Sequence, residues 1–300
     1  MDIPLIEQAV SENLRRPWKA LRVVDLNDRA SHPCALIHGD DGFAVFAKHT
    51  GVPEGLAEVK GLNLIRHRSG VRTPKPIGDG VVRADHGCYL LLEALREVPP
   101  ENRTDEQWRS IGHALATLHR VRDKRFGLEE HDGYFGPLPQ DNRPVGSNRW
   151  ADFLAQRHLE PGLRQAVDSR NLPAALRPGV ERVIARLPEL TGPEPEPALV
   201  HGDAQQNNFL ITAEGEAVLF DAAPHFGHPE ADLALVDYFA PVPAALFEGY
   251  KEIAPIDEGF RERRELWRLR GYLAVIAVDG ANAFGRAFLD RIARAVALYA

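Results

Sequence analysis

Three side chains that can move a proton or hold a metal ion follow one another in the second half of the sequence. Asp203 ends a His-Gly-Asp run, Asn208 follows five residues later, and Asp221 comes after a further apolar stretch. The apolar pair 199–200 precedes the run, so Asp203 is expected on the loop that ends a strand. A loop in this position can hold a carboxylate at a cleft.

A hairpin is predicted between Asn208 and Asp221. The segments 209–211 and 217–220 are apolar, and the turn that joins them is polar and contains a glycine. The returning strand therefore brings Asp221 back beside Asn208. One amide oxygen and one carboxylate suit Mg²⁺, which takes few protein ligands and leaves the rest to phosphate and water. Asp203 can then accept the proton of an attacking hydroxyl, which is the logic of phosphoryl transfer in the kinase fold.

A lysine that could hold the phosphates of ATP lies in the first part of the chain. Three antiparallel strands are predicted before it, over 21–26, 34–37 and 43–47. Lys48 ends the third strand, the position that kinases give to their phosphate-binding lysine. A helix predicted over 56–66 carries Glu58, which could pair with Lys48, and Glu54 is the alternative partner.

A hinge between two lobes is predicted where the last strand of this sheet, 89–92, ends. Backbone groups near Glu93 to Leu95 would bind adenine there, because a hinge uses its main chain. The chain is therefore divided into an N-terminal lobe, 1–93, with the nucleotide-binding sheet and helix, and a C-terminal lobe, 94–300. The second lobe is expected to be mostly helical and to contain the catalytic loop, metal site and substrate pocket.

The second lobe begins with a helix capped by Thr104, with Gln107 as its reciprocal partner. His119, near the end of that helix, is expected to pack in the core. The segment 126–145 is rich in Gly, Pro and Asn and is expected to be an irregular surface loop. Further helical segments are predicted over 150–158, 176–190 and most of the chain after 235.

The composition is that of an ordinary globular protein, with 44% apolar and 26% charged residues among 300. Lys and Arg number 36 against 43 Asp and Glu, and this net charge of −7 predicts neither a nucleic-acid partner nor a membrane surface. The N-terminus shows no signal peptide or spanning helix, so a cytoplasmic location is expected. With only Cys34 and Cys88, neither a disulfide framework nor a cysteine-based zinc site is expected.

Further marks accompany the His-Gly-Asp, Asn208 and Asp221 pattern. They are Phe126-Gly-Leu, Gly136, Gln140, Asn142, Trp150, Phe153, Arg157, Phe226-Gly227-His228, Asp232, Tyr250 and a helix from Trp267 that ends in Phe284-Gly285. With these marks the chain resembles the fructosamine kinase (ketosamine 3-kinase) family, a branch of the aminoglycoside-phosphotransferase-like and protein-kinase-like enzymes. The resemblance covers most of the chain from about residue 48.

The resemblance implies a two-lobed α+β protein-kinase-like fold, with an N-terminal antiparallel sheet plus helix and a mostly helical C-terminal lobe. It also implies ATP with Mg²⁺ and transfer of the γ-phosphate to a sugar hydroxyl of a ketosamine. Carried over to this sequence, Lys48 would hold the phosphates and Glu58 would orient it. Asp203 would be the catalytic base, and Asn208 and Asp221 the metal ligands.

Several positions depart from the family pattern or leave two roles open. Gln205 stands where the family has a tryptophan that lines the sugar pocket, which makes a more polar acceptor plausible. Asp232 would be a structural or a substrate-facing carboxylate of the lower lobe. Asp279 could attract a substrate amine or be a charge on a helix surface. The loop 25–33, which would cover ATP, contains no glycine.

Three functions are therefore weighed. The first is an ATP-dependent kinase of a small ketosamine, such as a fructosamine or ribulosamine, with glycated protein as a further possible acceptor. The second keeps the chemistry but takes another amino sugar or an aminoglycoside-like acceptor. The third is a pseudokinase-like binding module, which the glycine-free loop suggests and the retained Lys48, Asp203, Asn208 and Asp221 oppose. The sequence leaves the acceptor, the oligomeric state and any redox role of Cys34 open.

Overall fold

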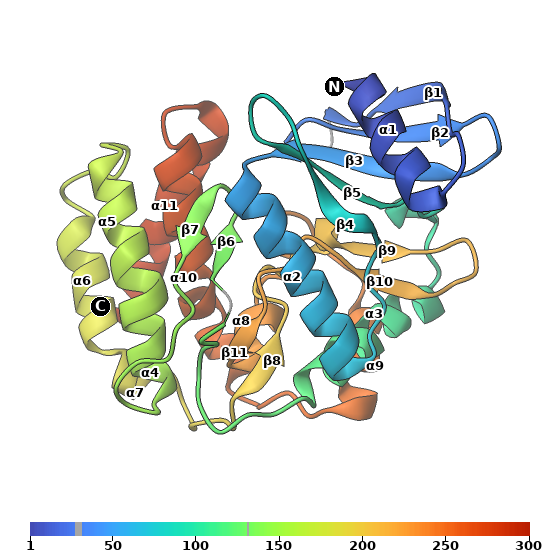
Figure 1. Cartoon of the computed structure of the whole chain (residues 1–300). Coiled ribbons are helices and arrows are strands. Elements are labelled where there is room, and N and C mark those ends of the chain that lie inside the picture. The colour runs from blue at the N-terminus through green and yellow to red at the C-terminus, as the bar shows by residue number, and fades with distance from the viewer. Residues whose placement is uncertain (28–31, 131) are drawn as a thin grey trace.

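The computed structural model consists of a five-stranded antiparallel sheet beside a largely helical body (Figure 1). It describes residues 1–27, 32–130 and 132–300. The expected N-terminal sheet with a helix and the helical second part are thus confirmed. Part of the glycine-free loop predicted to cover ATP, residues 28–31, lies outside the described residues.

The sheet has the strand order β1-β2-β3-β5-β4. Its strands are β1 (Ala20–Asp25), β2 (Cys34–Gly39), β3 (Ala44–Thr50), β4 (Pro76–Arg83) and β5 (Cys88–Glu93). Two helices cover it, α1 (Ile3–Leu14) and α2 (Val52–Ser69). The antiparallel strands predicted over 34–37 and 43–47 form the β2–β3 pair.

Each face of this sheet packs against one of the two helices. Val45 of β3 belongs to the core under α1, whereas Phe46 and Leu90 pack with Leu62 of α2. Side chains alternate between the two faces along a strand. Lys48 therefore lies on the same face as Phe46 and points toward α2.

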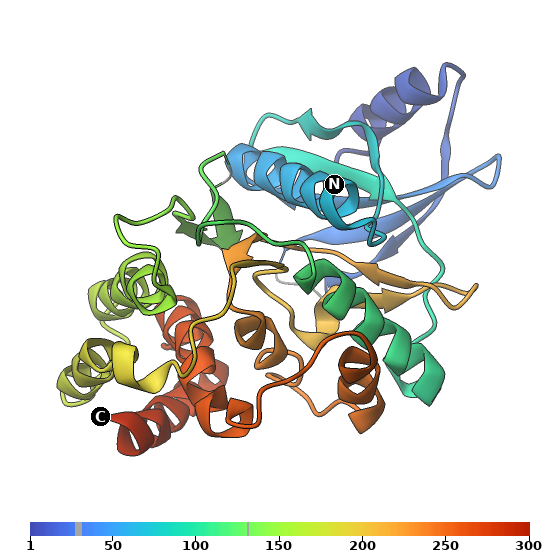
Figure 2. The same ribbon diagram turned by 90° about the horizontal axis from the view of Figure 1, so that it is seen from below.

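The second part of the chain holds most of the helices (Figures 1 and 2). They are η2 (Pro100–Asn102), α3 (Asp105–His119), α4 (Trp150–Phe153), the π-helical turn η3 (Leu154–Leu159), α5 (Glu160–Asp168), α6 (Arg177–Ala185), α7 (Leu187–Leu190), η4 (Gln206–Asn208), α8 (Pro229–Leu233), α9 (Ala244–Ile253), α10 (Phe260–Asp279) and α11 (Ala283–Tyr299). The capping box of α3 is confirmed, because Gln107 N donates to Thr104 Oγ1 at 3.3 Å and Thr104 N donates to Gln107 Oε1 at 2.9 Å. Within the described residues, no helix is both long and apolar enough to cross a bilayer.

Three short antiparallel pairs of strands complete this part. They are β6 (Gly133–Phe135) with β7 (Leu138–Gln140), β8 (Ala198–Val200) with β11 (His225–Gly227), and β9 (Phe209–Ile211) with β10 (Ala217–Leu219). The last pair is the hairpin predicted between Asn208 and Asp221.

Two expectations for this part were wrong. The segment 126–145 is not wholly irregular, because it contains the β6–β7 hairpin; its three-residue strands are too short to give a periodic signal. The helix from Trp267 does not run to Phe284-Gly285. It ends at Asp279, and a new helix begins at Ala283, where the Asn282 side chain accepts a hydrogen bond from Gly285 N at 2.9 Å as an N-cap.

Helices α3 and α9 approach each other closely at Gly112. A Cβ atom at this position would lie 2.0 Å from the carbonyl oxygen of Leu246 and 2.6 Å from the nitrogen of Tyr250. Both are backbone atoms of α9, so neither can move aside as a flexible side chain would. The close contact of these helices therefore requires glycine.

We expect Gly112→Ala to lower the free energy of unfolding by about 2 kcal/mol, because the added methyl forces the two helices apart. Urea denaturation measures the change. Gly146→Ala is the matched control, since a Cβ atom there would meet nothing within 4 Å. Equal stability of the two variants would contradict this account of the helix crossing.

Candidate active site

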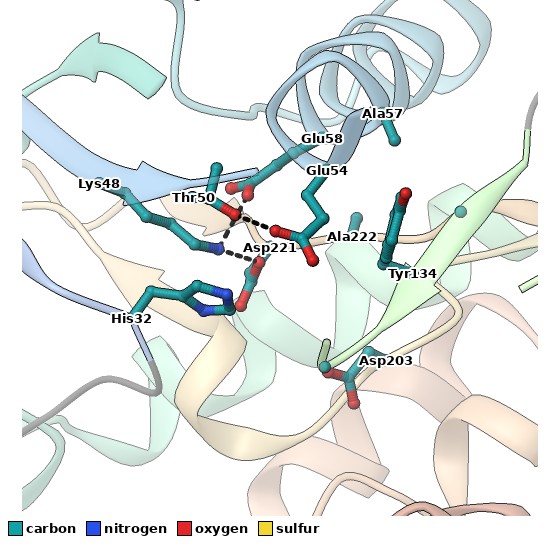
Figure 3. A pocket seen from close by; sticks show the side chains of 12 residues that line it. His32, Lys48, Thr50, Glu54, Ala57, Glu58, Tyr134, Asp203, Asp221 and Ala222 are labelled. Atoms are coloured by element: carbon teal, nitrogen blue, oxygen red, sulfur yellow. Dashed lines mark hydrogen bonds and ion pairs between the residues drawn. The ribbon is translucent and has the colours of Figure 1, made fainter. Parts of the chain in front are cut away.

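A cleft lies between α2, the β6–β7 hairpin and the loops that follow β8 and β10 (Figure 3). Its described lining consists of His32, Lys48, Thr50, Glu54, Ala57, Glu58, Gly133, Tyr134, Gly136, Asp203, Asp221 and Ala222. The structure thus brings the predicted lysine, its glutamate, the predicted base and one predicted metal ligand into a single space.

Lys48 forms ion pairs with two carboxylates. Its Nζ atom lies 2.9 Å from Glu58 Oε2 and 2.8 Å from Asp221 Oδ1. The expected pairing with Glu58 is present. The alternative partner, Glu54, instead accepts a hydrogen bond from Thr50 Oγ1 at 2.5 Å. Lys48 therefore links β3 to α2 and to the loop after β10 (Figure 3).

The three ionisable groups of this cluster shift one another's pKa values. Burial opposes the charge of Lys48, yet Asp221 and Glu58 together raise its pKa above the usual range. Burial raises the pKa of Glu58, against the opposing effect of Lys48. Partial desolvation would also raise the pKa of Asp221, but the Lys48 ammonium lowers it below its ordinary value. A cation would find a favourable place beside Asp221.

Asp221 has an unusual backbone conformation, with φ of 54°, in the left-handed region that aspartate tolerates better than most residues. Directly before it, Phe220 N donates to the carbonyl oxygen of Asn208 at 3.1 Å. This hydrogen bond extends the β9–β10 hairpin, so the fold does bring Asn208 and Asp221 to the same end. The Asp221 side chain remains 42% exposed although one of its oxygens is bound to Lys48.

The predicted base, Asp203, is held by the loop after β8. The Asn208 side chain donates through Nδ2 to the Asp203 carbonyl oxygen at 2.8 Å and to its Oδ2 at 3.2 Å. Burial, and secondly the negative charge of Asp221, raises the pKa of Asp203 to about 7, while Arg270 and hydrogen bonds from Gln205 and Asn208 oppose the shift. A carboxylate with such a pKa is suited to take a proton near neutral pH.

The Asp232 carboxylate holds the backbone of the loop that leads to Asp203. Its carboxylate accepts hydrogen bonds from His201 N at 2.5 Å and Gly202 N at 3.0 Å, and it lies 3.0 Å from His119 Nε2. Asp232 is 1% exposed, a position that favours the structural over the substrate-facing role. His119 is buried beside it and also contacts the Tyr250 hydroxyl at 2.9 Å, so the expectation that it packs is confirmed.

Asn208 and Asp221 fit a hard divalent cation by their donor chemistry. Because the Asn208 amide turns its nitrogen toward Asp203, its oxygen is left for another partner. Asp221 adds a carboxylate whose lowered pKa keeps it charged. Oxygen donors of this kind are those that Mg²⁺ prefers.

The first predicted hinge residue, Glu93, ends β5, and the second, Leu95, lies two positions further along the chain. The Glu93 side chain accepts a hydrogen bond at 3.0 Å from Lys75 N, directly before β4. Ala94 N donates to the Ala44 carbonyl oxygen at 3.4 Å. For Leu95, no hydrogen bond of its N–H is found within the described part of the chain, so this group is available to a ligand.

Two predicted substrate residues lie in different places. The Gln205 side chain lies close enough to Asp203 to lower the pKa of its carboxyl. Asp279 lies at the end of α10, outside the cleft lining, and accepts a hydrogen bond from Asn282 Nδ2 at 3.0 Å. Its position in the turn before α11 favours its interpretation as a helix-end charge.

Two residues near the site were not singled out from the sequence. Tyr134 reaches the cleft from β6 (Figure 3). Arg270 of α10 lies close enough to Asp203 to lower the pKa of its carboxyl. Tyr134 falls in the segment expected to be a loop, and Arg270 is one of several arginines on its helix. Neither position carries a local pattern that could have identified it.

Known proteins resemble the chain in sequence. The fructosamine kinase family profile matches residues 9–298. A probable ketoamine kinase from Synechocystis is 36% identical over 215 residues, which are 71% of this chain and 69% of that protein. A probable ketoamine kinase from Vibrio cholerae is 28% identical over 292 residues, 96% of this chain and 95% of its own length.

Solved structures resemble the chain as well. A crystal structure from Thermobifida fusca, provisionally assigned as a fructosamine-3-kinase, has a TM-score of 0.80 and 31% identity, and the match covers 97% of this chain and 98% of that one. The aminoglycoside phosphotransferase APH(4)-Ia shares the fold, with a TM-score of 0.60, 16% identity and 99% coverage of both chains. A thermostable mutant of that enzyme, solved with ADP and hygromycin B, gives a TM-score of 0.62 at 16% identity, covering 98% of this chain and 99% of that one.

The predicted kinase-like fold is thereby confirmed, as is the class of enzyme, a phosphotransferase with a hydroxyl acceptor. The match to the family profile extends over nearly the whole chain. The chain belongs to the fructosamine kinase family.

Proposed function

We propose that this protein transfers the γ-phosphate of ATP to a sugar hydroxyl of a ketosamine, such as a fructosamine or a ribulosamine. The observation that carries the proposal is that Lys48, bound by Glu58 and Asp221, shares one cleft with Asp203. The names of the relatives support a ketosamine acceptor. The ADP complex of the APH(4)-Ia mutant supports nucleotide binding by this fold.

Each part of the cleft has a task in this reaction. Lys48 binds phosphate oxygens, and Glu58 holds its ammonium in place. Asn208 and Asp221 hold Mg²⁺, which when bound offsets negative charge on the phosphoryl oxygens. Asp203 takes the proton from the acceptor hydroxyl as that oxygen attacks. Adenine binds along the backbone near Glu93 to Leu95.

The proposal divides the chain at this hinge. Residues 1–93 supply the nucleotide-binding sheet and helix, and residues 94–300 supply the base, the metal ligands and the acceptor pocket. The alternative of another amino-sugar acceptor rests on Gln205, whose polar amide stands beside Asp203 where the family pattern has an aromatic ring. An amide can hydrogen-bond to hydroxyl and amino groups but cannot stack as an indole does.

The test is ADP release from ATP and Mg²⁺ with a panel of acceptors: a fructosamine, a ribulosamine, a glycated protein, free amino sugars and an aminoglycoside. Turnover confined to ketosamines is the expected result. Turnover with amino sugars or the aminoglycoside alone would show that the acceptor is not a ketosamine, while the phosphoryl transfer itself would stand. Nucleotide binding without turnover of any acceptor would instead favour a binding module.

Asp203→Asn should reduce kcat at least a hundredfold and leave nucleotide affinity within a few-fold, because the base acts on the acceptor proton and not on ATP. Steady-state kinetics and titration with a fluorescent ATP analogue measure the two quantities. Full activity of the variant would show that Asp203 is not the base.

Asp203→Asn should also stabilise the unliganded protein at high pH. The pKa of Asp203 is raised by burial to about 7 in the folded state, so its charge destabilises the fold increasingly as pH rises from about 4 to about 7, and fully above that. The variant should therefore melt at a higher temperature than the wild type at pH 8, with a much smaller difference at pH 4.5. Differential scanning fluorimetry in magnesium-free buffer measures this, and the exposed Asp290→Asn is the control that should show no such trend.

Asp221→Ala should weaken nucleotide binding at least tenfold when Mg²⁺ is present, because the metal loses its carboxylate ligand. Isothermal titration with a non-hydrolysable ATP analogue, with and without EDTA, separates the metal-dependent part. A loss of affinity that is equally large in EDTA would assign Asp221 to the positioning of Lys48 alone.

A further inference from the structure

Arg270 connects two segments that both border the cleft. Its Nη1 donates to the carbonyl oxygen of Gly202 at 3.2 Å, directly before Asp203, and its Nη2 donates to Gln140 Oε1. Its guanidinium also lies over the Phe135 ring, 4.0 Å from the centroid. One side chain of α10 thus contacts the loop of the predicted base and both strands of the β6–β7 hairpin.

Gln140, the hairpin residue to which Arg270 donates, is itself held in place. Gln140 is buried, and its Nε2 donates to Asn142 Oδ1 at 2.5 Å and lies 3.1 Å from His158 Nε2. These contacts turn its Oε1 toward Arg270. The arginine therefore meets an acceptor of fixed direction, which suits the rigid geometry of a guanidinium.

The hairpin reaches the cleft on its other side. Tyr134 lines the cleft, and a Cβ atom on Gly133 would lie 3.1 Å from the Cβ of Ala223, two residues beyond Asp221. The hairpin therefore touches the loop of the predicted metal ligand, while Arg270 ties it to the loop of the predicted base. These two loops must keep their relative position if a phosphoryl group is to pass between the groups they hold.

Burial of the charged Arg270 guanidinium costs free energy of desolvation. Burial lowers its pKa to about 10, with Asp203 and Asp232 opposing the shift. A neutral side chain would avoid the desolvation of a guanidinium. A neutral amide could not, however, donate to Gly202 and Gln140 together while it stacks on Phe135.

We propose that Arg270 is a positioning residue that sets the place of Asp203 by clamping the Gly202 carbonyl to the β6–β7 hairpin. The proposal rests on the proposed function, in which Asp203 is the base. It goes beyond that function because it assigns a role in catalysis to a residue of the C-terminal helices and to a hairpin that the sequence did not reveal.

The test compares Arg270→Gln with Arg268→Gln, its matched control on the same helix. Arg268 is 12% exposed at its side chain and bonds Ala234 O, Asp237 and Glu265 instead of the loop of the base. Arg270→Gln should lower kcat ten- to a hundredfold with nucleotide affinity within threefold, because a small displacement of a catalytic group suffices for such a loss. Arg268→Gln should lower the melting temperature but keep kcat within twofold.

Two further variants test the contacts of the clamp separately. Arg270→Lys keeps the charge but cannot reach both acceptors, so its kcat should fall between those of the wild type and Arg270→Gln. Gln140→Ala frees the hairpin and leaves the Gly202 contact, and it should lower kcat less than Arg270→Gln does. These variants keep the test decisive if Arg270→Gln fails to fold.

Amide hydrogen exchange tests the clamp without any acceptor. In Arg270→Gln, exchange at 201–208 and at 133–140 should both become at least tenfold faster, whereas Arg268→Gln should leave both segments unchanged. Faster exchange in a protein that phosphorylates none of the acceptors would uphold the clamp and reject the proposed function. Unchanged exchange at both segments, or a kcat equal to that of Arg268→Gln, would overturn the role of Arg270.

Discussion

A single ammonium group, that of Lys48, joins the sheet, helix α2 and the loop after β10. Its two ion pairs, at 2.9 Å to Glu58 and 2.8 Å to Asp221, connect residues that are up to 173 positions apart in the sequence. Both carboxylates favour the charged form of Lys48, while burial opposes the charge of Glu58. The cluster therefore ties the position of α2 to that of Asp221, which borders the cleft.

The loop that carries Asp203, the proposed base, is held in a different way, through its backbone. Asp232 binds the amides of His201 and Gly202, and Arg270 binds the Gly202 carbonyl. The loop also crosses the chain after β10 so closely that a Cβ atom on Gly202 would lie 2.1 Å from the Ala223 carbonyl oxygen, and Gly202 adopts φ of 84°. Buried charges are expensive unless they are well bonded, and here they serve to fix a short loop rather than to stabilise the core.

The polar lining has consequences for the acceptor. Gln205 places an amide beside Asp203, and Tyr134 supplies an aromatic ring from the β6–β7 hairpin. An acceptor that offers hydroxyl and amino groups can use the amide, and the ring of a sugar can lie against an aromatic face. Tyr134 thus brings an aromatic face to the cleft, and Gln205 brings an amide next to Asp203 at the position where the family pattern has tryptophan.

The sequence alone determined the parts of the site that are set by short-range pattern. Asp203 and Asn208 are five positions apart in the sequence. Alternating apolar runs and turn residues, which act locally, predict the hairpin that returns to Asp221 and the strand that leads to Lys48. Only the tertiary structure decided that Lys48 contacts Asp221, that Asp232 is buried against the loop of Asp203, and that Arg270 joins this loop to the β6–β7 hairpin. These contacts join segments far apart in the chain, and they depend on how helices and strands pack, which no local periodicity encodes.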